Sequence, residues 1–245
     1  MVSAAAFATL LQHPASPIAA WQPGPLLRRV WMGIAMGVTA VSLIYSPWGR
    51  RSGAHMNPAV TLTFLRLGKV APRDAFGYIA AQLLGGSAGI VAATVMLGGL
   101  PSDSSVNYVA TLPGAGGWIV AFAGELGISF ALMTVVLGLS NVPRTAGFTG
   151  VAAGTLVAMC IIVESPLSGT SMNPARTLGS NVLADAAGSL WLYFTAPPLG
   201  MLLAAELFIR RHGLSWIRCA KLHHTSAARC IFRCGHTSVQ TEIAS

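Results

Sequence analysis

Residues 52–62 read SGAHMNPAVTL, and residues 168–178 read SGTSMNPARTL. The two stretches align without gaps at a constant offset of 116 residues, and eight of their eleven positions are identical. Two chance Asn-Pro-Ala turns would not share their flanks in this way, so the pair indicates an internal duplication. An odd number of membrane spans in each half would make the two halves inverted repeats.

The composition is poor in charge and rich in apolar residues. Of the 245 residues, 53% are hydrophobic and 9% are charged, against about 25% charged residues in an average soluble domain. The 22 charged side chains cannot cover the surface of a soluble domain of this length, and a disordered chain would be poor in apolar residues. The composition therefore predicts an all-α polytopic membrane protein whose apolar surplus faces lipid.

Five apolar stretches of about 20 residues predict membrane-spanning helices. Asp74, just after Pro72, is expected to cap the second of them. Ahead of the first, the apolar stretch from Val2 to Leu11 is too short to span. The five stretches are Leu26–Trp48, Ala75–Leu100, Trp118–Leu139, Ala146–Val163 and Ser189–Ile209.

Two further apolar segments follow Asn57 and Asn173 and are each about half a membrane thickness long. Asn is a good helix N-cap and Pro suits the first turn, so each motif predicts a helix start. If the two short helices enter from opposite faces, their partly positive N-termini meet inside the membrane and repel cations and protons. The two Asn amides would then offer hydrogen-bond donors to a water molecule in a pore and orient it.

With these features the sequence resembles the aquaporin family, the major intrinsic proteins. The resemblance covers about residues 1–210 and implies six transmembrane helices, the first one truncated here, plus two half-helices in an aquaporin-like inverted repeat. It also implies a homotetramer with one pore in each subunit, and no cofactor. It rests on Asn57, Pro58, Ala59, Asn173, Pro174 and Ala175, on Arg176 directly after the second motif, and on His55, Gln82 and Glu125.

This reading divides the chain into four parts. Residues 1–100 form the first inverted repeat, 101–117 an external connecting loop, 118–210 the second inverted repeat and 211–245 a basic tail that contains Cys and His. The family's first helix carries a Glu that faces the half-helix loops, but no acidic residue precedes Asp74. We therefore expect that Met1 is an internal residue of a longer chain or that the gene model is truncated, since a signal peptide would begin with basic residues.

The resemblance places a constriction ring at Met36, Ile161, Thr170 and Arg176. An Arg inside a membrane segment is a functional-site hypothesis by default, and here it follows the second motif directly. Water-selective members of the family carry Phe and His at the first two of these positions, whereas glycerol facilitators carry an aromatic pair and a small Gly in the ring. The ring predicted here is apolar at these two positions and contains no His. Small neutral solutes therefore remain candidate substrates beside water.

Two residues are expected to support the site. The resemblance gives Glu125 the role of holding backbone amides of the second half-helix loop, because irregular backbone needs hydrogen-bond partners. His55 is expected to anchor the first loop, with a pore-gating role as the less favoured alternative.

The basic residues predict the orientation. Twelve of them lie in the loop 48–73, at Arg144 and in the tail, against two at Arg28 and Arg29 on the other side. Positive charge marks cytoplasmic loops, so we expect a plasma (inner) membrane protein with a cytoplasmic tail.

The tail contains a group of Cys and His residues. A zinc site through Cys230, Cys234 and a His is conceivable, but the spacing matches no standard structural site. The favoured interpretation is therefore a solvated tail with incidental cysteines and no metal, with lipid modification of Cys219 as a further alternative. The group consists of His212, Cys219, His223, His224, Cys230, Cys234 and His236.

The leading functional hypothesis is a passive channel for water, and for small neutral solutes if the ring admits them, that excludes ions and protons. The alternatives are a facilitator of glycerol, urea, ammonia or metalloid acid with little water specificity, or a non-conducting membrane protein if the first helix is truly missing. A coupled transporter would need an ion site, and an enzyme would need a nucleophile and base. The sequence suggests neither, and its basic residues form no surface domain for nucleic acid. The expected partners are thus water or a small neutral solute, membrane lipid and other copies of the chain.

Overall fold

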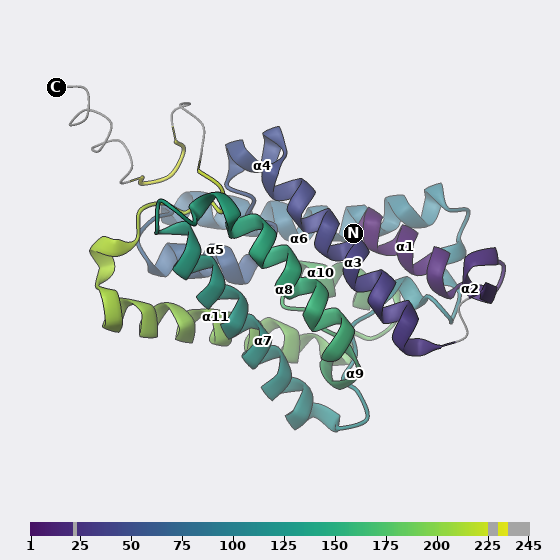
Figure 1. Ribbon diagram of the computed structural model, residues 1–245. Coiled ribbons are helices and arrows are strands. Elements are labelled where there is room, and N and C mark those ends of the chain that lie inside the picture. Colours follow the sequence, from purple (N-terminus) through teal and green to yellow (C-terminus); the bar gives the residue numbers. More distant parts are fainter. Residues whose placement is uncertain (22–23, 225–229, 235–245) are drawn as a thin grey trace.

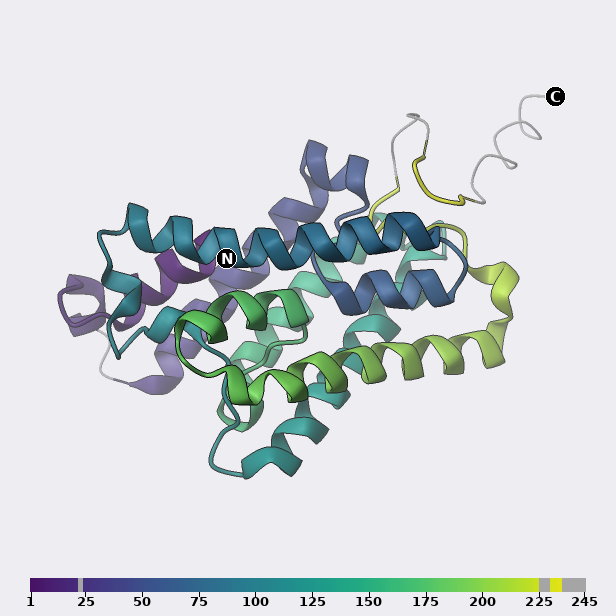
Figure 2. The same cartoon turned by 180° about the vertical axis from the view of Figure 1, so that it is seen from behind.

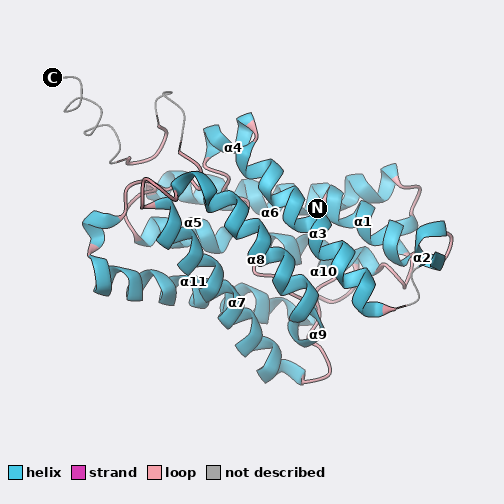
Figure 3. Ribbon diagram, in the orientation of Figure 1, coloured by secondary structure: helices cyan, strands magenta, loops and turns pink. Residues whose placement is uncertain are grey.

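The computed structural model describes residues 1–21, 24–224 and 230–234, and these fold into helices joined by loops (Figure 3). Five helical stretches are long and apolar enough to cross a membrane among the described residues, as the sequence predicts. They are Pro25–Tyr45 (α3), Pro72–Met96 (α6), Gly117–Ser140 (α7), Ala146–Val163 (η3, Ala146–Phe148, with α8, Thr149–Val163) and Ala187–His212 (η4, Ala187–Ser189, with α11, Leu190–His212). The all-helical membrane fold is thereby confirmed.

Several span boundaries differ from the prediction, such as the end of α6 at Met96 rather than Leu100, and two of them are explained by a proline. Asp74 does not cap α6: the helix begins at Pro72 with Ala71 as its N-cap, and Asp74 lies in its first turn. The first span ends at Tyr45 rather than Trp48, because Ser46 starts the short helix α4 (Pro47–Ser52) and its hydroxyl accepts a hydrogen bond from the Gly49 amide. In both cases a proline at the first helical position determines where the helix starts.

The two half-helices are α5 (Pro58–Arg66) and α10 (Pro174–Leu183). Figure 2 shows them between α6 and α11, which run above and below them, so that both motifs lie inside the bundle. The bundle is completed by α1 (Val2–Gln12), α2 (Pro17–Trp21), α9 (Ser165–Ser168) and the short 3₁₀ turns η1 (Leu100–Ser102), η2 (Asn107–Val109) and η5 (Leu214–Trp216) (Figure 1).

Glycines allow the helices to approach closely at two crossings. A Cβ added to Gly179 in α10 would lie 2.7 Å from the carbonyl oxygen of Gly86 in α6, and one added to Gly37 in α3 would lie 2.8 Å from that of Gly154 in α8. Small residues let helix backbones touch inside a membrane, where lipid gives no hydrophobic drive for association. The first crossing fixes the second half-helix against α6.

The outer face of the bundle is apolar. In α6 alone, Phe76, Leu84 and Val95 are 78%, 72% and 76% exposed. A soluble protein rarely exposes so many large apolar side chains together, so this surface fits contact with lipid. The chain is an integral membrane protein by this surface and by its five apolar helices.

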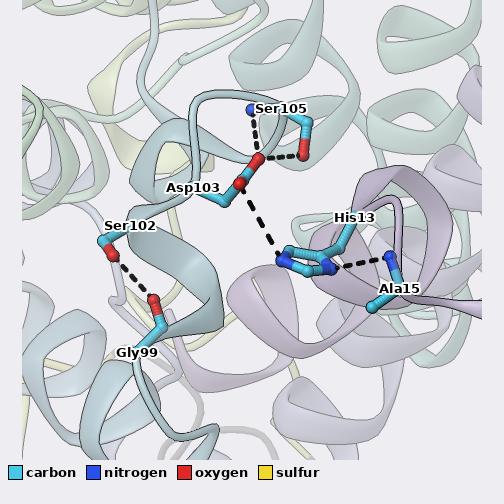
Figure 4. Close-up of polar contacts among 6 residues, drawn as sticks. All are labelled: His13, Ala15, Gly99, Ser102, Asp103 and Ser105. Carbon is cyan, nitrogen blue, oxygen red and sulfur yellow. Dashed lines mark hydrogen bonds and ion pairs between the residues drawn. The ribbon is translucent and has the colours of Figure 1, made fainter.

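The loops gather at two ends of the bundle. At one, which we call the tail end, the Arg218 amide donates to Asn141 Oδ1 over 2.8 Å and the Leu222 amide to the Gly53 carbonyl over 3.2 Å. At the opposite end, the imidazole of His13, just after α1, lies 4.0 Å from the Asp103 carboxylate, which also accepts hydrogen bonds from Ser105 (Figure 4). These contacts tie the short first helix to the loop between α6 and α7.

Much of the described tail is buried rather than solvated, most of all residues 219–223, which corrects the sequence interpretation. Cys219 and Lys221 are each 3% exposed and Ala220 is fully buried. Phe232 of the tail stacks on the imidazole of His55, which in turn stacks on Phe64, so these aromatic contacts hold the tail at this end. His236 lies outside the described residues.

Candidate functional site

The N-termini of α5 and α10 meet in the interior of the bundle. Asn57 caps α5 with its side-chain oxygen, which accepts from the Ala59 amide over 2.9 Å. Asn173 caps α10 in the same way, by accepting from Ala175 over 3.0 Å and from Arg176 over 3.4 Å. Each helix therefore begins where the sequence predicts, with its partly positive end toward the other.

The two motifs are also hydrogen-bonded to each other. Asn57 Nδ2 donates to the Met172 carbonyl over 2.6 Å, and Asn173 Nδ2 donates to the Met56 carbonyl over 2.8 Å. An Asn side-chain amide carries two N–H donors, so each amide keeps a second donor beyond this exchange. Prolines 58 and 174 and Ala59 are buried in the first turns behind the two caps.

Glu125 of α7 holds the loop that leads into α10. Its carboxylate accepts from the Ser171 amide over 2.5 Å, from the Met172 amide over 2.7 Å and from the Ser168 hydroxyl over 3.0 Å. Thr170 and Met172 in this loop have φ values of 51° and 52°, which non-glycine residues rarely adopt. The carboxylate thus supplies partners to a strained, non-helical backbone.

Arg176 is held by a residue that sequence reasoning missed. Its guanidinium donates to the hydroxyl of the buried Thr111, in the loop after η2. Asn181 of α10 fixes this loop by accepting from the Thr111 amide over 2.8 Å and donating to the Thr111 carbonyl over 2.7 Å. The sequence offers no signal for Thr111, because the contact joins positions 65 residues apart through a loop without a motif.

The hydroxyl of Thr170 has two partners that the sequence does not reveal. Its hydroxyl lies 2.7 Å from a carboxylate oxygen of Glu164, which is 8% exposed, and 3.3 Å from the carbonyl of Cys160. A hydroxyl has a single proton to donate, so the Thr170 oxygen keeps acceptor capacity.

His55 links the first loop to α6 and to the tail. Its Nε2 donates to the Ala220 carbonyl over 2.7 Å, and its own carbonyl accepts from Gln82 Nε2. Burial lowers the pKa of His55 to about 4, so the imidazole is neutral at pH 7. The side chain has the contacts of an anchor.

One cavity of about 1110 Å³ joins the proposed pore residues. Arg28 and Arg29 also line it, and no acidic residue is among its described lining residues. With the two helix N-termini, this charge distribution disfavours cations. The sequence-predicted residues that line the cavity are Met36, His55, Asn57, Ile161, Thr170, Asn173, Ala175 and Arg176.

Comparisons with known proteins agree with this architecture. A family model described as "Major intrinsic protein" matches residues 5–208. The chain is 36% identical over 173 residues to Aquaporin NIP1-3 of Oryza sativa subsp. japonica, an alignment that covers 70% of this chain and 58% of the relative. It is 37% identical over 182 residues to Aquaporin NIP3-1 of Arabidopsis thaliana, with 71% and 55% covered. The chain thus spans less than two thirds of the length of these relatives.

A solved structure shares the fold. The X-ray structure of the aquaglyceroporin from Plasmodium falciparum superimposes with a TM-score of 0.67 at 22% sequence identity, covering 84% of this chain and 89% of that one. This likeness concerns the fold, whereas the family model matches most of the chain and shows that the protein belongs to the major intrinsic protein family.

Proposed function

We propose that the protein is a passive channel for water and small neutral solutes that excludes ions and protons. The observation that carries the proposal is that both capping asparagines and Arg176 line the same cavity. A water molecule that accepts from both amides is oriented, which interrupts the hydrogen-bonded chain along which a proton would move. The helix N-termini and the guanidinium add a positive potential that repels cations.

The ring residues set the selectivity in this proposal. Met36 and Ile161 contribute apolar side chains, while Arg176 and the Thr170 hydroxyl contribute the polar ones. Half of the ring is apolar. A solute with hydrocarbon surface therefore enters it at little cost in free energy, because the transfer of apolar surface out of water is favourable. We therefore include glycerol, urea, ammonia and metalloid acids among the candidate solutes.

Assembly and orientation belong to the same proposal. Residues 1–100 and 118–210 form the two inverted repeats, joined by the external loop 101–117, and four copies form a tetramer. The tail end faces the cytoplasm of the plasma (inner) membrane, because it carries most of the basic residues.

Stopped-flow light scattering of vesicles reconstituted with the full chain tests the proposal. Vesicles with protein should shrink faster than empty vesicles in an osmotic gradient of an impermeant sugar. Re-swelling in glycerol, urea or another neutral solute then identifies what else passes. Shrinkage no faster than in empty vesicles, with correctly folded protein present, means that the chain does not conduct.

Replacing Arg176 is expected to weaken ion exclusion. Two like unit charges 4 Å apart repel by about 4 kcal/mol at an effective dielectric constant of 20, so R176A should raise proton or cation leakage by at least about tenfold. A pH-sensitive dye inside the vesicles measures the leak. R176K keeps the charge and should leak no more than the wild type. If R176A leaks equally little, the helix N-termini alone account for the exclusion of ions.

Replacing Ile161 tests the ring itself. Ile161→His adds a hydrogen-bonding group to the apolar side of the ring, and one hydrogen bond is worth about 1 kcal/mol. The ratio of glycerol to water permeability should therefore fall about fivefold. Met159→His, at a position that is 57% exposed on the same helix, is the control and should leave the ratio unchanged. An unaltered ratio in I161H would remove Ile161 from the ring.

A further inference from the structure

Four side chains with metal-binding chemistry converge in the tail. The sulfur atoms of Cys219, Cys230 and Cys234 and an imidazole nitrogen of His224 all lie within 4.8 Å of one another. The sulfurs of Cys219 and Cys230 are 3.5 Å apart, and that of Cys234 is 3.1 Å from His224 Nε2. Ligand atoms around a tetrahedral zinc ion lie about 3.5–3.8 Å apart, given Zn–S and Zn–N distances of about 2.3 and 2.0 Å. Small side-chain adjustments would therefore complete the tetrahedron.

We propose that these four residues form a structural zinc site that fastens the tail to the bundle. Three thiolates and one imidazole are a donor set that suits zinc, whereas magnesium and calcium prefer oxygen ligands. Four protein ligands leave no open position for water or substrate, which is the arrangement of a structural site rather than a catalytic one.

The order of the ligands along the chain supports the site. Three residues separate Cys230 from Cys234, which lies within the spacing of cysteine pairs in structural zinc sites. Cys219 and His224 supply the second pair. The two pairs come from separate arms of the tail, 219–224 and 230–234, so a zinc ion would cross-link the arms. The sequence interpretation disfavoured a metal because the spacing of the whole Cys and His set matches no standard structural site, and it did not count Cys219 among the candidate ligands.

A backbone amide contacts the sulfur of Cys219 in the way expected for a metal-bound thiolate. The Lys221 amide lies 3.5 Å from its sulfur and donates to it, and such outer contacts orient metal ligands and stabilise their charge. A zinc ion with three thiolates carries a net charge of about −1. Arg218, Lys221 and Arg233, which flank the ligands in the chain, supply positive charge to the same segment.

The two arms are hydrogen-bonded to the segments on either side of α5: the first arm to the loop before it and the second arm to the loop after it. From the first arm, the Leu222 amide donates to the Gly53 carbonyl, and from the second, the Arg233 amide donates to the Lys69 carbonyl, each over 3.2 Å. Phe232 stacks on His55 with ring centroids 5.3 Å apart. Because His55 lines the cavity and none of the described tail residues does, the zinc would brace the wall of the cavity without plugging it.

The metal content of the purified full chain tests the site. Protein kept reduced in detergent and equilibrated with zinc, then freed of excess metal, should retain one zinc per chain by mass spectrometry. Cobalt in its place should give the thiolate charge-transfer band and the strong visible bands of a tetrahedral ion. The double variant C230S/C234S should bind zinc at least tenfold more weakly. C160S, which changes the one cysteine outside the cluster, should still bind one.

Proteolysis of the tail provides a second readout, which does not require the zinc affinity to be measured. Trypsin should cleave after Lys221, which is 3% exposed, much faster when a zinc chelator is present than when zinc is. Circular dichroism and size exclusion confirm that the double variant keeps its membrane helices. Four results would each overturn the proposal. They are reduced wild type without zinc, equal zinc in the double variant, loss of zinc in C160S, and a Cys219–Cys230 disulfide in protein taken from the native membrane.

Discussion

Replacing Glu125 by Ala is expected to abolish water conduction. The substitution removes the acceptor for the Ser171 and Met172 amides and for the Ser168 hydroxyl, all in the buried loop that leads to Asn173. Each buried donor left without a partner costs about 1–3 kcal/mol. Without these acceptors the loop should rearrange and displace the second motif. Osmotic permeability per reconstituted chain measures the loss.

Glu125→Gln provides the matched comparison. The amide has nearly the same shape and keeps one oxygen acceptor, but its NH₂ group faces an N–H donor in place of the second oxygen. Permeability should therefore lie between that of the wild type and that of E125A. Wild-type permeability in E125A, at equal protein per vesicle, would show that the loop holds itself in place.

The second large effect is expected from Gly179→Val. A Cβ at this position would lie 2.7 Å and 2.8 Å from the carbonyl oxygen and carbon of Gly86, and 3.0 Å from the Ser87 amide nitrogen. Overpacking of a core usually costs about 1–3 kcal/mol, and more is expected here because the neighbours are backbone atoms that no rotamer change can move. The half-helix α10 should separate from α6, with loss of monodisperse protein and of conduction.

Gly77→Ala in α6 is the control for this prediction. A Cβ added to Gly77 meets no atom within 4 Å, and Ala favours a helix over Gly by about 1 kcal/mol. Size exclusion and thermal unfolding in detergent should show G77A at least as stable as the wild type. A folded, conducting G179V would mean that the crossing of α6 and α10 is not tight in the membrane.

The helices and their starts could be predicted because their signals are local. A window of 20 apolar residues identifies each span, and Asn followed by Pro identifies the start of each half-helix. The prediction that Asp74 caps its helix was wrong for the same reason: Asp is a good capping residue, but Pro72 begins the helix two residues earlier. Local preference identified the element but not its first residue.

The environment of the ring could not be predicted, because it depends on contacts between distant loops. Arg176 stands out as a charge within a membrane segment, whereas its partner Thr111 is an ordinary residue in an ordinary loop. Glu164 likewise follows an apolar stretch in the sequence without any motif that would place its carboxylate beside Thr170. The burial of the tail has the same kind of cause, since it depends on the stacking of Phe232 on the distant His55.

The exchange of hydrogen bonds between the two motifs has a consequence for biosynthesis. Asn57 is made more than a hundred residues before Met172, whose carbonyl is its partner, and the Met56 carbonyl must wait as long for Asn173. While the ribosome completes the second half, the first half-helix loop stands in the membrane with polar groups that lipid cannot satisfy. The nascent first half therefore needs water or an insertion factor at this loop until the second half arrives, and neither half alone makes a finished membrane domain.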